Sequence, residues 1–394
     1  MIDVTFLIST HNRGMVLVDT LARIGNCGLP ASRYEVIVVD NASDDGAAEL
    51  VAHWFRDVKL IRLADNRGPC AKNEGLTIAR GRYVVFLDDD SYPMPGSIAR
   101  MIGHFERDAH LGAATFTVTL PNGQRECSAY PNVFIGCGTG FRKVALDEVG
   151  GLPTDFFMQA EEYDLSLRLM NAGWAVRAFD DLHVTHLKTP VARYPQRVAM
   201  LDVRNNLVLA ARHFPLRWAI AYGFDWTRRY CWIAKVNGRR GAHARGVLAA
   251  LLMIARGVGR RPVSDDVFEQ FSRMREIDRQ MREVASDTGA RRVLFIDVGK
   301  NALAYHRAAN RLGLTVVAIA DETLGGHGFS YHGVPVVTDA VAATLTFDVA
   351  IVTNLSPVHA ANRLTAWRNR TTRQVIDLFE PQIQAQEHPV RMAA

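Results

Sequence analysis

The chain has 394 residues, of which 48% are hydrophobic and 22% are charged, and its formal net charge is +5. This length suits two domains better than one, and the composition excludes a wholly disordered chain. The longest uninterrupted apolar run, residues 247–255, is too short to cross a bilayer. No secretory signal pattern opens the chain, and five widely spaced cysteines favour a reducing cytoplasm.

The positive charge is concentrated in one segment of the chain. Residues 191–264 contain 14 Lys and Arg against 2 Asp and Glu, a local balance of +12 that leaves −7 for the rest. Such a segment is typical of a region that meets phospholipid headgroups, a pyrophosphate or a nucleic acid. A solvated basic face is the alternative.

Short apolar runs alternate with helical patterns through the first half of the chain. The runs at 4–9, 35–40, 58–63 and 83–87 are predicted strands, and the helical patterns between them are at 15–24, 47–55 and 72–79. This alternation predicts a parallel, doubly wound α/β sheet, whose ligands bind at the carboxyl ends of the strands.

The sequence from about residue 195 to 285 is long, helical and rich in arginine. Trp218, Tyr222, Trp226 and Tyr230 are four residues apart and form one aromatic stripe on a helix. The stripe suits either the headgroup region of a membrane or intramolecular packing on the catalytic domain. Nucleic acid is disfavoured because no nucleic-acid motif accompanies the charge. Residues 265–287 are predicted as one linking helix.

A second, smaller α/β pattern follows. Its predicted strands are at 293–297, 316–321, 334–337, 349–353 and 375–378, with helices near 302–312, 339–345 and 358–367. The first strand leads to a single glycine, Gly299, where a dinucleotide-binding loop needs three, and Asp321 ends the second strand where a ribose-binding acid would stand. A Rossmann-like domain with a degenerate or regulatory role is therefore favoured over nicotinamide chemistry.

Three consecutive carboxylates, Asp88, Asp89 and Asp90, follow the predicted strand at 83–87. They cannot all be buried without a positive partner, and carboxylates beside substrate phosphates are typical Mg²⁺ or Mn²⁺ ligands. In an extended segment Asp88 and Asp90 point to the same side and Asp89 points away. A solvated acidic turn is the alternative. Polar loops at 9–13, 40–46 and 66–75 are expected at the same edge of the sheet.

These loops and one further stretch resemble the inverting family 2 glycosyltransferases of the GT-A fold. The matching stretches are VTFLISTHNR, EVIVVDNASDDG, NRGPCAKNEGLTIARGRYVVFLDDDSYP and GCGTGFRKVALDEVGGLPTDFFMQAEEYDLSLRLMNAGW. The region up to about residue 264 is similar to the helical tail of bacterial rhamnosyltransferase-like members. The resemblance implies a GT-A catalytic domain at 1–190, an Arg-rich helical extension and linker at 191–287, and the Rossmann-like domain at 288–394.

The resemblance also implies roles for single residues. Asp40 would recognise the base of a nucleoside diphosphate sugar, Asp88 would contact ribose or sugar, and Asp90 would hold the metal with His186 nearby. The other residues expected to bind substrate are Thr10, Asn12, Arg13, Asn41, Arg67, Asn73 and Asp89. For His186 a satisfied core histidine or a surface histidine is the alternative.

The family's acidic motif falls at Glu161-Glu162-Tyr163-Asp164, with Glu162 at the position of the catalytic base. Asp is the commoner base in the family, so Asp164 competes with Glu162. A carboxylate in the first turn of a helix is favoured in its charged form, which suits a base. The alternative for both glutamates is ordinary helix-start preference.

The sequence thus predicts a metal-dependent inverting glycosyltransferase that uses Mn²⁺ or Mg²⁺. The expected partners are a nucleoside diphosphate sugar and a glycan or lipid-linked acceptor, in bacterial polysaccharide or glycolipid synthesis, without nucleic acid. The expected location is cytoplasmic, with contact between residues 215–262 and an anionic membrane as an option, and oligomer formation stays open. The main alternative is a non-catalytic nucleotide-sugar scaffold or sensor; an oxidoreductase centred on the C-terminal domain is disfavoured by the single Gly299.

Overall fold

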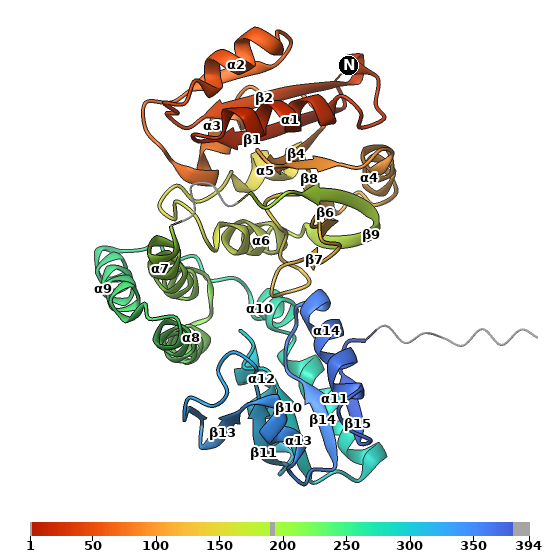
Figure 1. Ribbon diagram of the computed structural model, residues 1–394, viewed down its shortest axis with the longest axis vertical. Helices are drawn as coiled ribbons and strands as arrows, with labels where there is room; N and C mark the ends of the chain where they lie inside the picture. The colour runs from red at the N-terminus through yellow and green to blue at the C-terminus, as the bar shows by residue number, and fades with distance from the viewer. Residues whose placement is uncertain (1, 190–193, 381–394) are drawn as a thin grey trace, which may run out of the picture.

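The computed structural model describes residues 2–189 and 194–380. Its first part is a mixed sheet with helices on both faces (Figure 1). The strands are β1 (Val4–Thr10), β2 (Tyr34–Asp40), β3 (Lys59–Arg62), β4 (Tyr83–Asp88), β5 (Ser91–Pro93), β6 (Leu111–Thr119), β7 (Arg125–Glu126), β8 (Thr139–Arg142) and β9 (Ala175–His186). The helices are α1 (Gly14–Ile24), α2 (Ala47–Trp54), α3 (Lys72–Leu76), α4 (Ser97–Arg107), α5 (Lys143–Val149) and α6 (Glu161–Asn171), with 3-10 turns η1 (Ala31–Arg33) and η2 (Gly68–Ala71).

The strand order of this sheet is β3-β2-β1-β4-β8-β6-β9-β5, with β7 paired to β6. β3, β2, β1 and β4 are parallel, so their carboxyl ends share one edge. The core strands are buried on both faces, as the continuous apolar runs require. The predicted α/β fold with a doubly wound sheet is confirmed.

A group of helices follows the first sheet, and a second α/β unit ends the described chain. The helices are α7 (Pro195–His213), α8 (Leu216–Val236), α9 (Arg240–Arg256), α10 (Asp265–Ser272) and α11 (Met274–Thr288). The second sheet contains β10 (Arg292–Ile296), β11 (Thr315–Ala320), β12 (Ser330–Tyr331), β13 (Val334–Val337), β14 (Val349–Val352) and β15 (Gln374–Asp377), with α12 (Ala302–Arg311), α13 (Asp339–Ala343) and α14 (Pro357–Arg368).

The second sheet has the order β12-β13-β11-β10-β14-β15, and all pairs except β12 with β13 are parallel. In Figure 1 this sheet lies at the bottom in blue, the first sheet lies at the top, and α7, α8 and α9 lie to the left in green. Among the described residues, no helix combines the length and apolarity that a membrane crossing requires.

The prediction of one linking helix over residues 265–287 is wrong, because the chain breaks at Arg273. This residue is left-handed, with φ of 53°, and it separates α10 from α11. Phe268 and Phe271 on α10 and Ile277 on α11 are all buried, and a straight helix could not turn both segments inward. The Arg273 guanidinium stacks 3.7 Å from the ring centroid of Phe379, which keeps the charge at the surface of the break.

The aromatic stripe of α8 packs inside the protein. Tyr222, Trp226 and Tyr230 are buried, and Trp218 stacks on Phe268 with ring centroids 5.6 Å apart. These four side chains pack inside the molecule, as the intramolecular alternative expects, but on α7, α10 and the C-terminal unit rather than on the catalytic domain. The same helix exposes its other face, which is apolar at several positions.

Candidate active site

A large cleft of about 1750 Å³ opens where the three parts of the chain meet. Its walls come from the carboxyl ends of β1 and β4, the start of α6, helices α7 and α8, and two loops of the C-terminal unit. The predicted site residues that line it are Thr10, Arg13, Asn41, Asp88, Asp89, Glu161, Glu162 and His186. Residues far apart in sequence therefore share one cavity.

Arg13 organises the carboxylates at the end of β4. Its guanidinium donates to Asp89 at 2.5 Å and to Asp90 at 2.7 Å, and Thr10 donates its hydroxyl to Asp89 at 2.8 Å. β4 ends at Asp88, and the chain turns at Asp89 and Asp90. The expected strand alternation is therefore wrong: Asp88 and Asp89 line the cleft, and Asp90 lies behind the lining.

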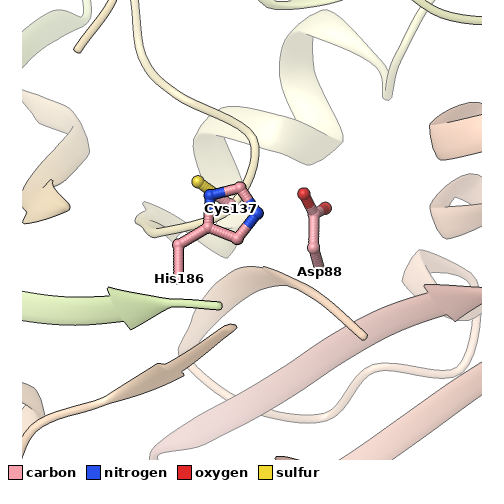
Figure 2. A group of neighbouring side chains, drawn as sticks. All are labelled: Asp88, Cys137 and His186. Atoms are coloured by element: carbon pink, nitrogen blue, oxygen red, sulfur yellow. The ribbon is translucent and has the colours of Figure 1, made fainter. Parts of the chain in front are cut away.

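Asp88, Cys137 and His186 form the one group of potential metal ligands found among the described residues, with ligand atoms all within 4.8 Å of one another. Figure 2 shows the Asp88 carboxylate and the His186 ring side by side, with the Cys137 sulfur close to the ring. Asp90 is not one of these three residues, but its carboxylate lies 3.3 Å from His186 Nε2, at ion-pair distance. Carboxylate and imidazole, the side chains of Asp88 and His186, are ligand types that Mg²⁺ or Mn²⁺ accepts.

The chemistry of the group favours oxygen and imidazole ligands over sulfur. Burial raises the pKa of the Cys137 thiol to about 11, so it stays protonated, and thiols are poor ligands for Mg²⁺ and Mn²⁺. Burial alone would lower the pKa of His186, but hydrogen bonds with Asp90, Cys137 and Glu126 raise it to about 12. A cation at His186 Nε2 would replace that proton, while Glu126 would keep the ring oriented through Nδ1 at 2.8 Å.

Glu161 and Glu162 begin α6 and face the cleft. Glu161 is buried, and one of its oxygens has no hydrogen-bond partner in the described chain. Burial raises the pKa of Glu162, and the charge of Asp88 raises it further, while its own backbone amide and the charges of Lys300 and Lys72 lower it. A carboxylate with a raised pKa and a free face is suited to accepting a proton near neutral pH.

The loop before α6 is held in an unusual conformation. Phe157, Gln159 and Ala160 all have positive φ, between 65° and 73°, which costs free energy in residues other than glycine. The side-chain amide of Asn205 on α7 holds the loop by donating to the carbonyls of Phe156, Met158 and Gln159 at 2.7–3.0 Å. Asn205 therefore fixes the position from which the two glutamates enter the cleft.

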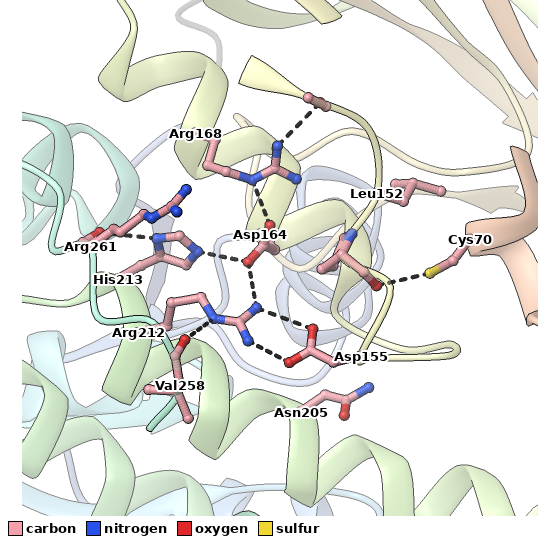
Figure 3. Close-up of polar contacts among 12 residues, drawn as sticks. Cys70, Leu152, Asp155, Asp164, Arg168, Asn205, Arg212, His213, Val258 and Arg261 are labelled. Atoms are coloured by element: carbon pink, nitrogen blue, oxygen red, sulfur yellow. Dashed lines mark hydrogen bonds and ion pairs between the residues drawn. The ribbon is translucent and has the colours of Figure 1, made fainter. Parts of the chain in front are cut away.

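Asp164, the competing candidate base, is surrounded by cations away from the cleft. Its carboxylate accepts hydrogen bonds from Arg168 at 2.7 Å, Arg212 at 3.2 Å and His213 at 2.7 Å (Figure 3). Burial alone would raise the pKa of Asp164, but the hydrogen bond from His213 and the charge of Arg168 outweigh it and hold the pKa below its ordinary value. This environment suits a structural ion pair between α6 and α7 rather than a proton acceptor.

Replacing Asp164 with Asn should destabilise the fold by about 3–5 kcal/mol at pH 7, because it leaves buried cations without their counter-ion. Since the folded pKa is depressed, the stabilisation is complete above the unfolded pKa of about 3.9 and is lost as pH falls through the folded value. Urea unfolding at pH 7 and pH 3 should therefore show a smaller difference between D164N and wild type at pH 3. Asp147→Asn, which breaks an exposed pair with Lys143, is the control and should change stability by less than about 1 kcal/mol. An equal loss in both variants would contradict the structural role.

The remaining predicted residues lie outside the cleft lining: Asn12, Asp40, Arg67, Asn73, Asp90 and Asp164. Asp40 accepts from the Ser43 amide, and Asn73 holds Leu152 through two backbone hydrogen bonds of 2.8 Å. Arg67 pairs with Asp65 and Glu74 at the surface. Their roles in binding substrate stay predictions.

Four residues of the cleft were not predicted from the sequence. Lys72 is buried, and its Nζ lies 3.3 Å from the Asp88 carboxylate. Glu126 is hydrogen-bonded to His186, and Cys137 forms the potential metal-ligand cluster with Asp88 and His186. Lys300 reaches the cleft from the C-terminal unit. Lys72 and Cys137 lie within the quoted motifs and carried a signal there, whereas no local pattern links Lys300 to this site.

Comparison with known proteins identifies the first part of the chain. Residues 5–150 match the model of the Glycosyl transferase family 2. These residues form a family 2 glycosyltransferase domain. The match covers β1 to β4 with their polar loops and confirms the predicted family, whereas the likeness to rhamnosyltransferase tails stays a prediction.

The curated relatives of the family 2 domain carry the name of a polysaccharide synthase. The poly-beta-1,6-N-acetyl-D-glucosamine synthase of Staphylococcus aureus (strain COL) is 28% identical over 198 residues, 44% of this chain and 47% of the relative. The enzyme of the same name from Staphylococcus epidermidis is 29% identical over 191 residues, 42% and 45% of the two chains. The chain thus spans about half the length of the curated relatives it matches.

Solved structures give weaker likenesses. The mannosyltransferase PcManGT from Pyrobaculum calidifontis, in complex with GDP-Man and Mn²⁺, is 19% identical with a TM-score of 0.47, over 79% of this chain and 86% of that one. TarS 1-349 of S. aureus, in complex with UDP-GlcNAc, is 14% identical with a TM-score of 0.47, over 79% and 93%. Because these TM-scores are low, the comparison carries no argument about the fold. The architecture is described from the strand order of the chain itself.

Proposed function

We propose that the protein is a metal-dependent inverting glycosyltransferase that moves a sugar from a nucleoside diphosphate sugar to a hydroxyl acceptor. The observation that carries the proposal is that Glu162 and the Asp88–Cys137–His186 cluster line one cleft, on a chain whose residues 5–150 match family 2. Transfer to a hydroxyl needs a base for the acceptor and a stabilised diphosphate leaving group. The cleft has residues for both.

Glu162 is the proposed base. It would take the proton of the acceptor hydroxyl as that oxygen attacks the anomeric carbon from the face opposite the diphosphate. The new glycosidic bond forms while the bond to the diphosphate breaks, so the anomeric configuration inverts. Glu161, whose pKa burial raises, and Lys72 beside Asp88 would orient the donor sugar between them.

Asp88, Asp90 and His186 would hold the metal, with Glu126 orienting the histidine. Bound Mn²⁺ or Mg²⁺ neutralises charge that develops on a departing diphosphate. Arg13 and Thr10 keep the neighbouring Asp89 fixed at the edge of β1.

The proposal is tested by a thermal-shift screen of nucleoside diphosphate sugars with and without Mn²⁺, followed by an assay of nucleoside diphosphate release. Binding of the donor with metal should raise the unfolding temperature, since ligands that bind only the native state stabilise it. Metal-dependent release supports transfer chemistry. Stabilisation by donors without release, across a panel of glycan and lipid-linked acceptors, favours the alternative of a non-catalytic nucleotide-sugar scaffold.

We also place the protein at the inner face of the cell membrane, in the cytoplasm, in polysaccharide or glycolipid synthesis. Two exposed apolar stripes support this placement. Leu216, Ile220 and Phe224 are spaced four apart on α8, and Leu248 and Leu251 lie on α9, all more than half exposed. Exposed basic side chains on the same helices include Arg217, Lys235, Arg240 and Arg256. Apolar stripes flanked by arginine suit the interface of an anionic bilayer.

Replacing Phe224, which is 77% exposed, with Ser should weaken binding to phosphatidylglycerol vesicles about tenfold, because an aromatic side chain is no longer buried in the bilayer. Co-sedimentation at low salt measures this. Trp54→Ser is the matched control, because Trp54 is 67% exposed and its helix α2 lies at the other end of the molecule from α8 (Figure 1). If both variants sediment like wild type, α8 does not contact the membrane.

A further inference from the structure

The C-terminal unit turns the ligand-binding edge of its sheet toward the cleft. In a doubly wound sheet this edge, after the first strand, is where a phosphate would bind. Here α8 holds the loop after β10: Arg229 donates to the Val298 carbonyl at 2.8 Å, Trp226 donates to the Lys300 carbonyl at 2.8 Å, and Tyr222 donates to Asn301 at 2.5 Å. The loop is therefore part of the wall between the two units.

This loop delivers Lys300 into the cleft beside α6. Its ammonium donates to Asn206 at 3.0 Å and lies 4.1 Å from the ring centroid of Tyr163, the residue after Glu162. Neither contact is an ion pair, although the nearby charge of Asp202 helps to raise the pKa of the lysine. The charge is felt at Glu162, whose pKa Lys300 lowers.

Two more cations line the cleft. Arg229 and Arg239 come from α8 and from the residue before α9, and both are partly buried. Within residues 2–189 and 194–380, neither arginine nor Lys300 has a carboxylate within ion-pair distance. Asp202 is close enough for Lys300 and Arg229 to lower its pKa, although burial raises that pKa overall. Partly buried cations without counter-ions are favourable where an anionic ligand completes the site.

These cations come from α8, the start of α9 and the C-terminal unit, whereas the residues expected to hold the donor come from the first sheet. Arg13, Asp88 and Asp89 lie at the ends of β1 and β4. Lys300, in contrast, packs over α6 on the side of Tyr163, next to the base. A ligand bound by Lys300 would therefore meet Glu162 from the acceptor side.

We propose that Lys300, Arg229 and Arg239 form a phosphate subsite for the acceptor, so that the C-terminal unit supplies one wall of the transferase site. The ligand is an acceptor carrying a phosphate or diphosphate, either on a lipid or on a soluble sugar. This inference rests on the proposed function, because Glu162 identifies the acceptor side. It also gives the C-terminal unit a role that needs no dinucleotide.

The test is calorimetric titration of the full chain, preloaded with UDP and Mn²⁺, with three probes: glucose 1-phosphate, farnesyl diphosphate and glucose. The variants are Lys300→Met and Arg239→Gln. The matched controls are Lys143→Met on α5, where the lysine pairs with Asp147, and Arg373→Gln, at an exposed position before β15; neither residue lines the cleft. Urea unfolding of each variant accompanies the titrations, because Lys300 also lies in the wall between the units.

We expect at least one phosphate probe to bind wild type, with about tenfold weaker affinity in K300M and R239Q, since each loses a charge-assisted contact. Glucose should not bind, and the controls should match wild type. Preference for farnesyl diphosphate identifies a lipid source, and preference for glucose 1-phosphate a soluble one. Phosphate binding that is equal in all variants, or absent in wild type, overturns the proposal.

Donor affinity gives the independent readout. UDP with Mn²⁺ should bind K300M and R239Q as it binds wild type. Loss of UDP binding in both variants would assign these cations to the donor and overturn the subsite. If no nucleoside diphosphate binds wild type while a phosphate probe still binds at Lys300, the proposed donor function fails and the phosphate site stands.

Discussion

Glu162→Gln should lower the rate of sugar transfer by about 1000-fold, because the amide cannot take the proton of the acceptor hydroxyl. The substitution keeps the shape of the side chain at the start of α6, where Glu162 lines the cleft. Binding of the donor with Mn²⁺ should stay within about threefold of wild type, since a general base contributes to the transition state rather than to donor binding. The measurement is transfer rate at saturating donor, with calorimetry for donor affinity.

Glu106→Gln is the matched control for this substitution. Glu106 lies on α4, half exposed, and faces Arg82 at 3.7 Å, outside the cleft lining. Its replacement should leave the transfer rate unchanged. Full activity in E162Q would remove Glu162 from the mechanism; Asp164, held by Arg168, Arg212 and His213, would then need a rearrangement of α7 to reach an acceptor.

Asp90→Asn should weaken Mn²⁺ binding by about 100-fold or more, with a matching loss of transfer. The reason is that the Asp90 carboxylate lies at ion-pair distance, 3.3 Å, from His186 Nε2, and the proposed function assigns both side chains to the metal. The measurement is a titration with Mn²⁺ in which the electron paramagnetic resonance signal of the free ion reports how much is bound. Asp88→Asn is tested in parallel, because Asp88 lines the cleft and Asp90 lies behind the lining. The two variants show which carboxylate contributes more to Mn²⁺ affinity.

Asp44→Asn serves as the control for metal binding. Asp44 is an exposed carboxylate in the loop after β2, and it tests whether loss of any nearby negative charge weakens Mn²⁺. The variant should bind the ion like wild type. Circular dichroism must show D90N folded, because the change also removes a partner of Arg13. Folded D90N that binds Mn²⁺ normally would leave Asp88 and His186 as the metal site.

Local sequence patterns were enough for the fold of the family 2 domain. The apolar runs bounded by turn residues predicted the ends of β1, β2 and β4 to within one residue. Because parallel strands place their carboxyl ends at one edge, the loops with Thr10, Asn41 and Asp88 were expected together, and they line one cleft.

The sequence could not choose between Glu162 and Asp164. Successive residues of an α-helix are about 100° apart, so these two side chains point to nearly opposite faces of α6. Which face meets the cleft depends on α7, whose Arg212 and His213 enclose Asp164 and leave Glu162 to the cavity. That choice is made by packing between distant segments, which no spacing within the motif encodes.

The sequence by itself determined the family, the α/β fold and the strand ends that carry the carboxylates, because short-range patterns of apolar and turn residues specify these features. Only the tertiary structure decided where the side chains of the basic helical segment and of the C-terminal unit lie. It buries the aromatic stripe of α8 and brings Lys300 from the C-terminal unit beside Glu162. Both outcomes come from contacts between units far apart in the chain, and such contacts leave no periodic signal in the sequence.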